Sequence, residues 1–266
     1  MTRTCKFSFH VGVVIAAIIY IYLSTVFVFI DRWLGFSSSP GILNAAVFTF
    51  LAIMCITSYR RAIYTDPGRV PNTFMPDVED SGNPIHEIKR KGGDLRYCHK
   101  CSHFKPPRAH HCRICNRCVL RMIFFIFVVY AVISCIYSLV LLVGSASVDS
   151  QQDAEDSDRV IHVISGLLLV PLSVALGFFL AWHIYLIVKN KTTIEYHEGV
   201  RAMWLADKGG QLYSHPYDIG AYDNLIEILG PKIHCWLCPT SGHVGSGLHF
   251  RTKYDKLIGS VSPIPD

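Results

Sequence analysis

The chain has 266 residues, of which 51% are hydrophobic and 17% charged, and its formal net charge is +5. A soluble domain carries about 25% charged residues, so this composition argues against an ordinary soluble protein. The positive charge is also concentrated, because thirteen of the Lys and Arg residues lie in the single stretch 60–122.

Four apolar segments are each long enough to cross a hydrocarbon core of about 30 Å, which needs roughly 20 residues. None contains Asp, Glu, Lys or Arg. A buried core helix of this length normally shows a polar stripe, so hydropathy favours membrane spans. The first segment is predicted to be a retained span, because its apolar run is too long for a typical signal peptide. The segments are 11–30, 42–59, 123–147 and 161–188.

The loops between these segments predict an orientation. The loop 148–159, "VDSQQDAEDSDR", has five acidic residues and one basic residue, in contrast to the basic stretch 60–122. The positive-inside rule then places both termini and the basic stretch in the cytosol, at a bilayer whose anionic headgroups suit that charge. Nucleic acid is disfavoured as a partner because the basic stretch is tethered between two spans, and a transporter because the spans lack charged residues.

We therefore predict an all-α membrane protein with four transmembrane helices and a small zinc-binding, cysteine-rich cytosolic module between the second and third helices. Pro67, Gly68 and Pro71 interrupt any helix after the second span, and a short helix is expected near "KTTIEYHEGVRAMWL". The predicted organisation is a first hairpin at 1–64, a linker with the cysteine-rich module at 65–122, a second hairpin at 123–188 and a cytosolic tail at 189–266.

The module reads "CHKCSHFKPPRAHHCRICNRC". Cytosolic thiols stay reduced, so five cysteines in 21 residues indicate a metal site in preference to disulfides. Zinc takes four tetrahedral ligands, and a C-x2-C turn points two thiolates at one ion. His99 and His103 compete as ligands but are expected to be solvated. One complete site can be built from Cys98, Cys101, His111 and Cys118.

Cys112 and Cys115 form a second C-x2-C pair, but this pair supplies only two of four ligands. Beyond Met122 the sequence has no His, Cys, Asp or Glu before Cys135, which lies inside the third span. A thiol of this pair, left without zinc, would be a candidate nucleophile because nearby Arg side chains lower a thiol pKa.

Cys235 and Cys238, in "HCWLCP", are candidates for the two missing ligands. A C-x2-C spacing alone is only moderately specific for a metal site. We favour a membrane-facing or acylated turn at this position.

The module sequence "CHKCSHFKPPRAHHCRICNRCVLRM" resembles the cysteine-rich domain of the DHHC protein S-acyltransferases, or palmitoyltransferases, and is most similar to plant-type members. Asp66, Pro67 and Gly68 resemble the family's Asp-Pro-Gly motif after the second span. Thr192, Thr193 and Glu195 resemble its Thr-Thr-x-Glu motif after the fourth span, and Asn224 stands at its C-terminal Asn position. The resemblance covers nearly the whole chain.

The resemblance implies transfer of a fatty acyl group from acyl-CoA to cysteine thiols of client proteins. In the family, "CVLRM" is followed by an Asp-His-His-Cys motif whose Cys is the nucleophile and whose His is the base, and by further zinc ligands. This sequence instead passes from Met122 directly into the third span. No catalytic residue can be assigned, and the chain is expected to be inactive by itself. The alternative is a non-catalytic scaffold or dominant-negative partner of a full-length acyltransferase, in the Golgi, endoplasmic reticulum or plasma membrane.

Overall fold

The computed structural model describes residues 9–71, 73–75, 96–113, 116–119, 124–149, 156–208, 215–238, 248 and 250–253. The chain divides into two compact units. The first unit comprises Met1–Thr65 and Ile123–Trp182, and the second comprises Asp66–Met122 and His183–Asp266.

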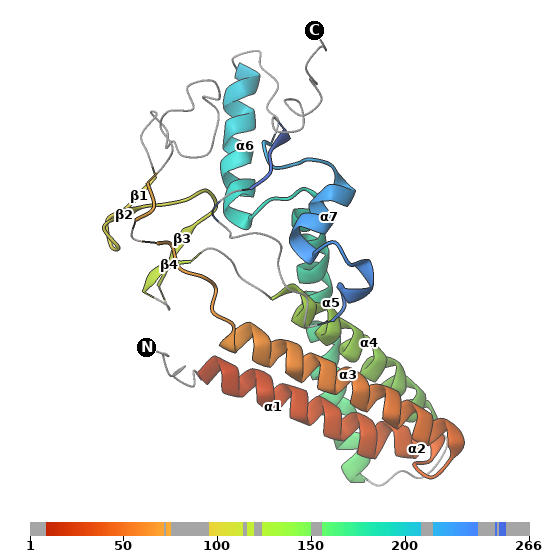
Figure 1. Cartoon of the computed structure of the whole chain (residues 1–266). Coiled ribbons are helices and arrows are strands. Elements are labelled where there is room, and N and C mark those ends of the chain that lie inside the picture. The colour runs from red at the N-terminus through yellow and green to blue at the C-terminus, as the bar shows by residue number, and fades with distance from the viewer. Residues whose placement is uncertain are drawn as a thin grey trace. The chain divides into compact units, whose positions relative to one another are not determined.

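Long apolar helices build the first unit (Figure 1). Among the described residues, four helical stretches are long and apolar enough to cross a membrane, which confirms the predicted four spans. The third begins at Phe125, just after the predicted start at Ile123, which lies outside the described residues. The helices are α1 (Phe9–Ser24), η1 (Thr25–Phe29) and α2 (Ile30–Leu34), which run on as one stretch, then α3 (Ser39–Tyr64), α4 (Phe125–Asp149) and α5 (Asp156–Val188).

A tight turn joins the first two spans. Gly35 takes a positive φ of 74°, and Ser38 caps the N-terminus of α3 by accepting a hydrogen bond from the Gly41 N–H at 3.0 Å. A Cβ atom on Gly41 would overlap the Gly35 carbonyl, so the turn requires glycine at this second position.

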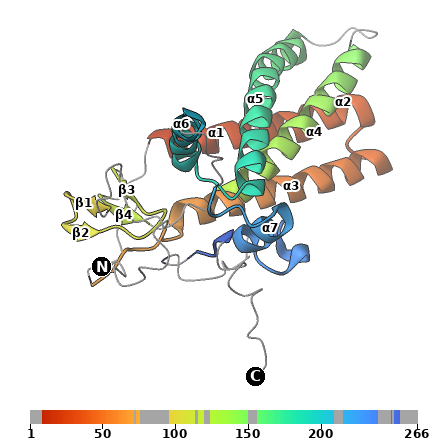
Figure 2. The ribbon, with the colours of Figure 1, turned by 90° about the horizontal axis from the view of Figure 1, so that it is seen from above.

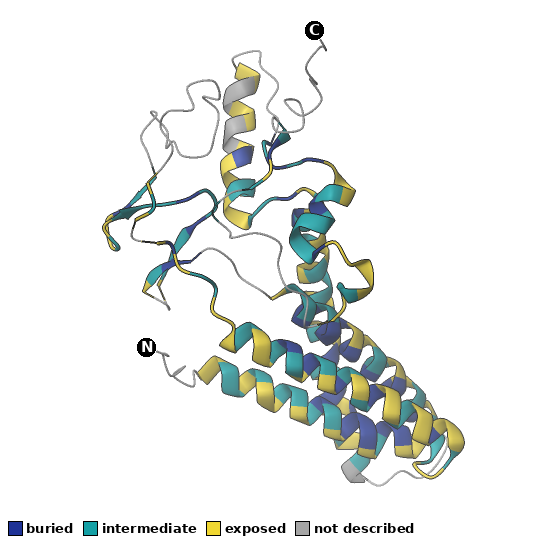
Figure 3. Ribbon diagram, in the orientation of Figure 1, coloured by how far each residue is buried: buried dark blue, intermediate teal, exposed yellow. Residues whose placement is uncertain are grey.

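The core of the first unit lies between the helices, and their outer faces stay apolar and exposed (Figure 3). Phe29, Phe48 and Leu169 come from three different spans and are each at most 1% exposed. By contrast, Leu167 and Phe178 on α5 are more than 70% exposed. An exposed apolar surface of this kind is stable in hydrocarbon, which explains why these helices need no further protein cover.

Polar side chains connect the spans. The hydroxyls of Thr25 and Ser138 lie 2.6 Å apart, and the Tyr137 hydroxyl donates to the Asn44 side chain at 2.6 Å. Thr25 is the first residue of η1, a short π-helical stretch, and its hydroxyl also donates to the Ile21 carbonyl. Interhelical hydrogen bonds in membranes contribute about 0.6 kcal/mol each on average, so they align the helices more than they stabilise them.

The second unit contains short strands that the sequence did not predict. β1 (Tyr97–Cys98) pairs with β2 (His103–Phe104), and β3 (His110–Cys112) pairs with β4 (Arg117–Val119), both antiparallel. Figure 2 shows the two hairpins beside each other.

The remaining elements of this unit follow α5. They are α6 (Thr193–Lys208), α7 (Ala221–Leu229) and the 3-10 turn η2 (Ile233–Cys235). α6 confirms the helix expected near "KTTIEYHEGVRAMWL". It begins with a capping box, in which Thr192 Oγ1 accepts from the Glu195 N–H and Glu195 Oε2 accepts from the Thr192 N–H.

Candidate metal centre and the motifs around it

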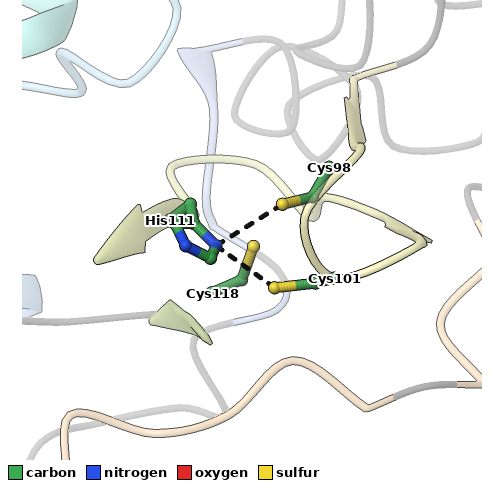
Figure 4. A group of neighbouring side chains, drawn as sticks. All are labelled: Cys98, Cys101, His111 and Cys118. Carbon is green, nitrogen blue, oxygen red and sulfur yellow. Dashed lines mark hydrogen bonds between the residues drawn. The ribbon is translucent and has the colours of Figure 1, made fainter. Parts of the chain in front are cut away.

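The four residues predicted to form one zinc site lie together (Figure 4). His111 Nδ1 lies 3.2 Å from Cys101 Sγ and 3.6 Å from Cys98 Sγ, and the four ligand atoms, including Cys118 Sγ, are all within 4.8 Å of one another. A tetrahedral zinc ion with bonds of about 2.0–2.3 Å holds its ligand atoms roughly 3.3–3.8 Å apart. The donor set therefore fits a zinc ion, and the two distances from His111 Nδ1 to sulfur are close to the spacing that such an ion requires.

The two hairpins explain why these four side chains meet. Cys98 ends β1, and its carbonyl accepts hydrogen bonds from the N–H groups of Cys101 and Ser102, at 3.2 and 2.8 Å. This closes a turn that places both thiols on one side. In the second hairpin, His111 and Cys118 are directly paired across β3 and β4, so their side chains share a face of the ladder.

A small apolar core surrounds the cluster. Val70, Ala109, Cys98 and Cys118 are all at most 5% exposed. Burial disfavours thiolate at Cys98, but hydrogen bonds from the Cys118 thiol and from main-chain N–H groups outweigh it and lower the Cys98 pKa. Burial and the neighbouring sulfurs raise the pKa of Cys118 to about 12. Without a cation the Cys118 thiol therefore stays protonated, and a divalent metal ion would favour the thiolate form that binds it.

The second C-x2-C pair begins a turn like the first. In both hairpins the cysteine that ends the first strand pairs with the residue five positions later, Cys98 with His103 and Cys112 with Arg117. The residue before each of these partners has a positive φ, 55° at Ser102 and 49° at Asn116. Cys115 itself lies outside the described residues, so the geometry of this pair stays a prediction.

Cys235 and Cys238 are described, and neither belongs to the ligand cluster that the described residues form. Cys112, Cys235 and Cys238 also do not gather as three ligands within the described part of the chain. The proposal that the tail completes a second metal site gains no support from this arrangement.

Asp66, in the "TDPG" motif, contacts the module. Arg117 Nη2 donates to Asp66 Oδ1 at 2.6 Å, and the Gly68 N–H donates to the same oxygen at 3.0 Å. The hydrogen bond from Arg117 is the main cause of a lowered Asp66 pKa. Gly68 has a φ of 81°, a conformation in which glycine is favoured, and Pro67 ends the preceding helix.

Glu195, in the "TTIE" motif, forms a bidentate ion pair with Arg108. Arg108 Nε and Nη2 donate to the two carboxylate oxygens at 2.9 and 3.0 Å, and the two side chains are 8% and 14% exposed. Burial opposes the charge on Glu195, but Arg108 outweighs it and the Glu195 pKa is lowered. Arg108 has a positive φ of 61°, which is rare for a bulky residue and indicates that its surroundings hold it in place. Thr193 begins α6 and is exposed.

Asn190 and Asn224 complete this buried network. Arg108 donates to both the side-chain and main-chain oxygens of Asn190, at 2.8 and 2.7 Å. Asn224 is fully buried, donates to the Val188 carbonyl at the end of α5 and accepts from the Ile219 N–H. Because these partners are main-chain groups, an isosteric apolar residue at 224 would leave them unsatisfied.

Sequence reasoning missed three members of the network: Arg108, Asn190 and His215. The His215 side chain is 5% exposed, and its Nε2 lies 3.2 Å from the Asn190 carbonyl oxygen and 4.0 Å from Glu195 Oε2. Burial lowers its pKa, although Glu195 opposes that shift. The sequence did offer a hint for Arg108, because this residue lies inside the cysteine-rich stretch, between the C-x2-C pairs that begin at Cys98 and Cys112.

Comparison with known proteins connects these features. The model of the DHHC palmitoyltransferase family matches residues 91–122 and 123–200. The chain is 63% identical to "Probable protein S-acyltransferase 16" of Arabidopsis thaliana, over 96% of each chain. It is 44% identical to "Probable protein S-acyltransferase 15" of the same plant, over 89% of this chain and 99% of that one. It is also 25% identical to "Palmitoyltransferase ZDHHC15A" of Danio rerio, over 94% of this chain. This protein, with its four apolar helices and its cysteine–histidine cluster, belongs to the DHHC palmitoyltransferase family.

Proposed function

We propose that this chain is a non-catalytic member of the S-acyltransferase family that acts through its membrane helices and its zinc-binding module. The observation that carries the proposal is the direct passage from Met122 into the third span, with no Asp-His-His-Cys sequence between them. Without that motif the chain lacks the thiol that takes the acyl group from acyl-CoA, and covalent catalysis has no nucleophile.

Two features of the comparisons support this reading. The family model matches in two segments that meet between Met122 and Ile123, where the motif would stand. The alignment with the Arabidopsis relative is 274 positions long, which exceeds the 266 residues of this chain, so it contains positions that this chain does not fill.

The proposal also covers the metal sites and the orientation in the membrane. We propose that one zinc ion binds at the cluster of Cys98, Cys101, His111 and Cys118, and that the Cys112 and Cys115 pair is the remnant of a second site. We also propose that the module and both termini face the cytosol, because Lys and Arg concentrate in 60–122. The buried pair of Arg108 and Glu195 would then keep the module folded without the catalytic segment.

The proposal is tested with purified protein and labelled palmitoyl-CoA. We expect no hydroxylamine-sensitive label on the native chain, and the same result when Cys235 and Cys238 are both replaced by Ser. The matched control inserts the corresponding segment of a full-length relative between Met122 and Ile123, and this variant should become labelled. A thioester label on the native chain that disappears with Cys112→Ala or Cys115→Ala would contradict the proposal.

We further propose that the chain binds a full-length acyltransferase or its client proteins and limits acylation. This idea rests on the match of the family model to both the module and the later spans, at residues 91–122 and 123–200. Co-expression with a full-length relative should yield a complex that co-purifies in mild detergent and slows client acylation. Unchanged client acylation at excess of this chain, with no co-purification, would rule out the partner role while leaving the inactivity unaffected.

A further inference from the structure

The segment after α7 forms a tight turn that exposes sulfur. The Trp236 N–H donates to the Ile233 carbonyl at 3.1 Å, and the Cys238 N–H donates to the Cys235 carbonyl at 2.9 Å. The Trp236 indole N–H donates to the Gly230 carbonyl at 2.8 Å, which fixes the ring at the end of α7. Of the eight cysteines that the structure describes, Cys238 is the exposed one, and Cys235 is half-buried.

This turn differs from the zinc-binding turn that begins at Cys98. There, the residue after the second cysteine is Ser102, which has a positive φ of 55° and donates its N–H to the Cys98 carbonyl. The equivalent position in the tail is Pro239. Proline has no N–H, so it cannot donate the hydrogen bond that Ser102 donates in the module. The tail pair is therefore poorly suited to bind a metal in the way the module does.

The surroundings of the two thiols are apolar and basic. Ile233 is 55% exposed and Leu237 is 58% exposed, so the aliphatic side chains project from the same turn as the cysteines. Lys232 precedes them and is also exposed. Exposed aliphatic groups beside a cation favour contact with the headgroup region of a bilayer.

The turn also lies a short way along the chain from the end of a membrane span. Asn224 in α7 donates to the carbonyl of Val188, the last residue of α5, at 2.8 Å. From Asn224 to Leu229 the helix rises only about 7.5 Å, and the turn follows directly. The turn therefore follows directly on a helix that is hydrogen-bonded to the last residue of the fourth span.

We propose that the turn at Cys235–Cys238 is an S-acylation site, with Cys238 as the main acceptor of a fatty acyl group. The donor is the acyl-thioester of a full-length S-acyltransferase, itself loaded from acyl-CoA. The Cys238 sulfur attacks the acyl carbon, a new carbon–sulfur bond forms and the carbon–sulfur bond to the donor cysteine breaks. The proton lost from Cys238 passes to the departing thiolate, and no oxidant or reductant takes part. This goes beyond the proposed function, because the chain here is the acceptor of the acyl group.

The test uses the full chain co-expressed with a full-length relative. Thiols are blocked, hydroxylamine releases thioester-bound cysteines, and a maleimide–polyethylene glycol reagent adds a mass tag to each released thiol. We expect a tagged band for the native chain, loss of most of it in Cys238→Ser, and complete loss in the variant with both Cys235→Ser and Cys238→Ser. Cys112→Ser is the matched control and should leave this tag unchanged. Size-exclusion profiles of all variants check that they fold.

The other outcomes are distinguishable. A tag that persists in the double Ser variant overturns the site, as does a tag released by a reductant alone, which would indicate a disulfide. Absence of any tag in the presence of an active relative also overturns it. If the native chain is tagged at Cys238 in bacterial cells that lack the family, the acceptor site stands but the proposed lack of activity fails. If the chain is tagged only when the full-length relative is present, the result supports both the acceptor site and the proposed lack of activity.

Discussion

Arg108 and Glu195 are 87 residues apart in the sequence and form a buried, bidentate ion pair. Arg108 belongs to the cysteine-rich module, and Glu195 belongs to the first turn of α6. The same guanidinium lies 4.6 Å from the centre of the Tyr217 ring and 5.1 Å from that of Phe250. One side chain therefore connects the module, the residues after the fourth span and the tail.

Replacing Arg108 by Ala should destabilise the second unit strongly. Breaking a buried pair leaves an uncompensated charge, which costs about 3–5 kcal/mol. Arg108→Lys should recover only part of this loss, because an ammonium group cannot form the bidentate contact. The midpoint of thermal unfolding in detergent, followed by size-exclusion chromatography, measures the effect.

The matched control is Arg117→Ala, which removes the more exposed pair with Asp66. Exposed pairs contribute about 0–1 kcal/mol, so this variant should unfold close to the native chain. If Arg108→Ala and Arg117→Ala lost equal stability, burial would not explain a difference between the two ion pairs. Glu195→Gln combined with Arg108→Ala should cost less than the sum of both single changes.

The purified chain should hold about one zinc ion, because the described residues bring together one set of four donor atoms, the number that a structural zinc site needs. Cys98→Ser or His111→Ala should remove the ion and loosen the module, since metal binding and folding are coupled. Elemental analysis of protein purified without chelators gives the content. Cys112→Ser is the control and should retain the ion. A content of two ions per chain would mean that other ligands complete the second pair.

The second unit should lose stability as the pH falls below the ordinary His pKa of about 6.5, because His215 is buried and neutral. Its pKa is lowered in the folded state, so the unfolded chain binds a proton first and acid favours unfolding. The loss should continue until the pH reaches the folded-state pKa. Amide hydrogen exchange at residues 215–229, measured at pH 7.5 and 5.5, reports this effect.

Glu195 contributes to the pH dependence of stability in a separate, lower pH range. Its folded-state pKa is lowered, so its contribution is complete above the unfolded pKa and is lost as the pH falls through the folded value. His215→Gln should therefore flatten the dependence between pH 7.5 and 5.5 and leave the steeper loss at lower pH. An unchanged slope in this variant would assign the effect to another group.

Gly144 should tolerate no side chain while Trp33 is present. A Cβ atom at this position in α4 would overlap the indole ring, which belongs to the α2 end of the first span. Gly144→Ala should cost about 1–3 kcal/mol by overpacking. Gly166→Ala and Gly177→Ala are matched controls on α5, because nothing lies within 4 Å of either added Cβ atom. Thermal unfolding in detergent compares the three variants.

A second substitution tests the cause. Trp33→Val should restore most of the stability lost in Gly144→Ala, since it removes the overlapping ring. If the double variant is no more stable than Gly144→Ala alone, the close approach of these two residues does not explain the loss.

Local sequence patterns determined a large part of this protein. Runs of about 20 apolar residues without charge are enough to predict spans, because a bilayer core selects length and hydropathy and little else. The position of the candidate ligands Cys98 and Cys101 is likewise set by a local turn, and the direct passage from Met122 into an apolar segment can be read from the sequence.

Only the tertiary structure decided how distant residues meet. The strands of the module are two or three residues long, too short for a periodic signal, and His111 joins Cys118 through ladder pairing. Arg108 finds Glu195, and Asn224 finds Val188, across 87 and 36 residues. Such contacts depend on the global packing of the chain, because a buried polar group must find its hydrogen-bond partners within the protein, however distant they are in the sequence.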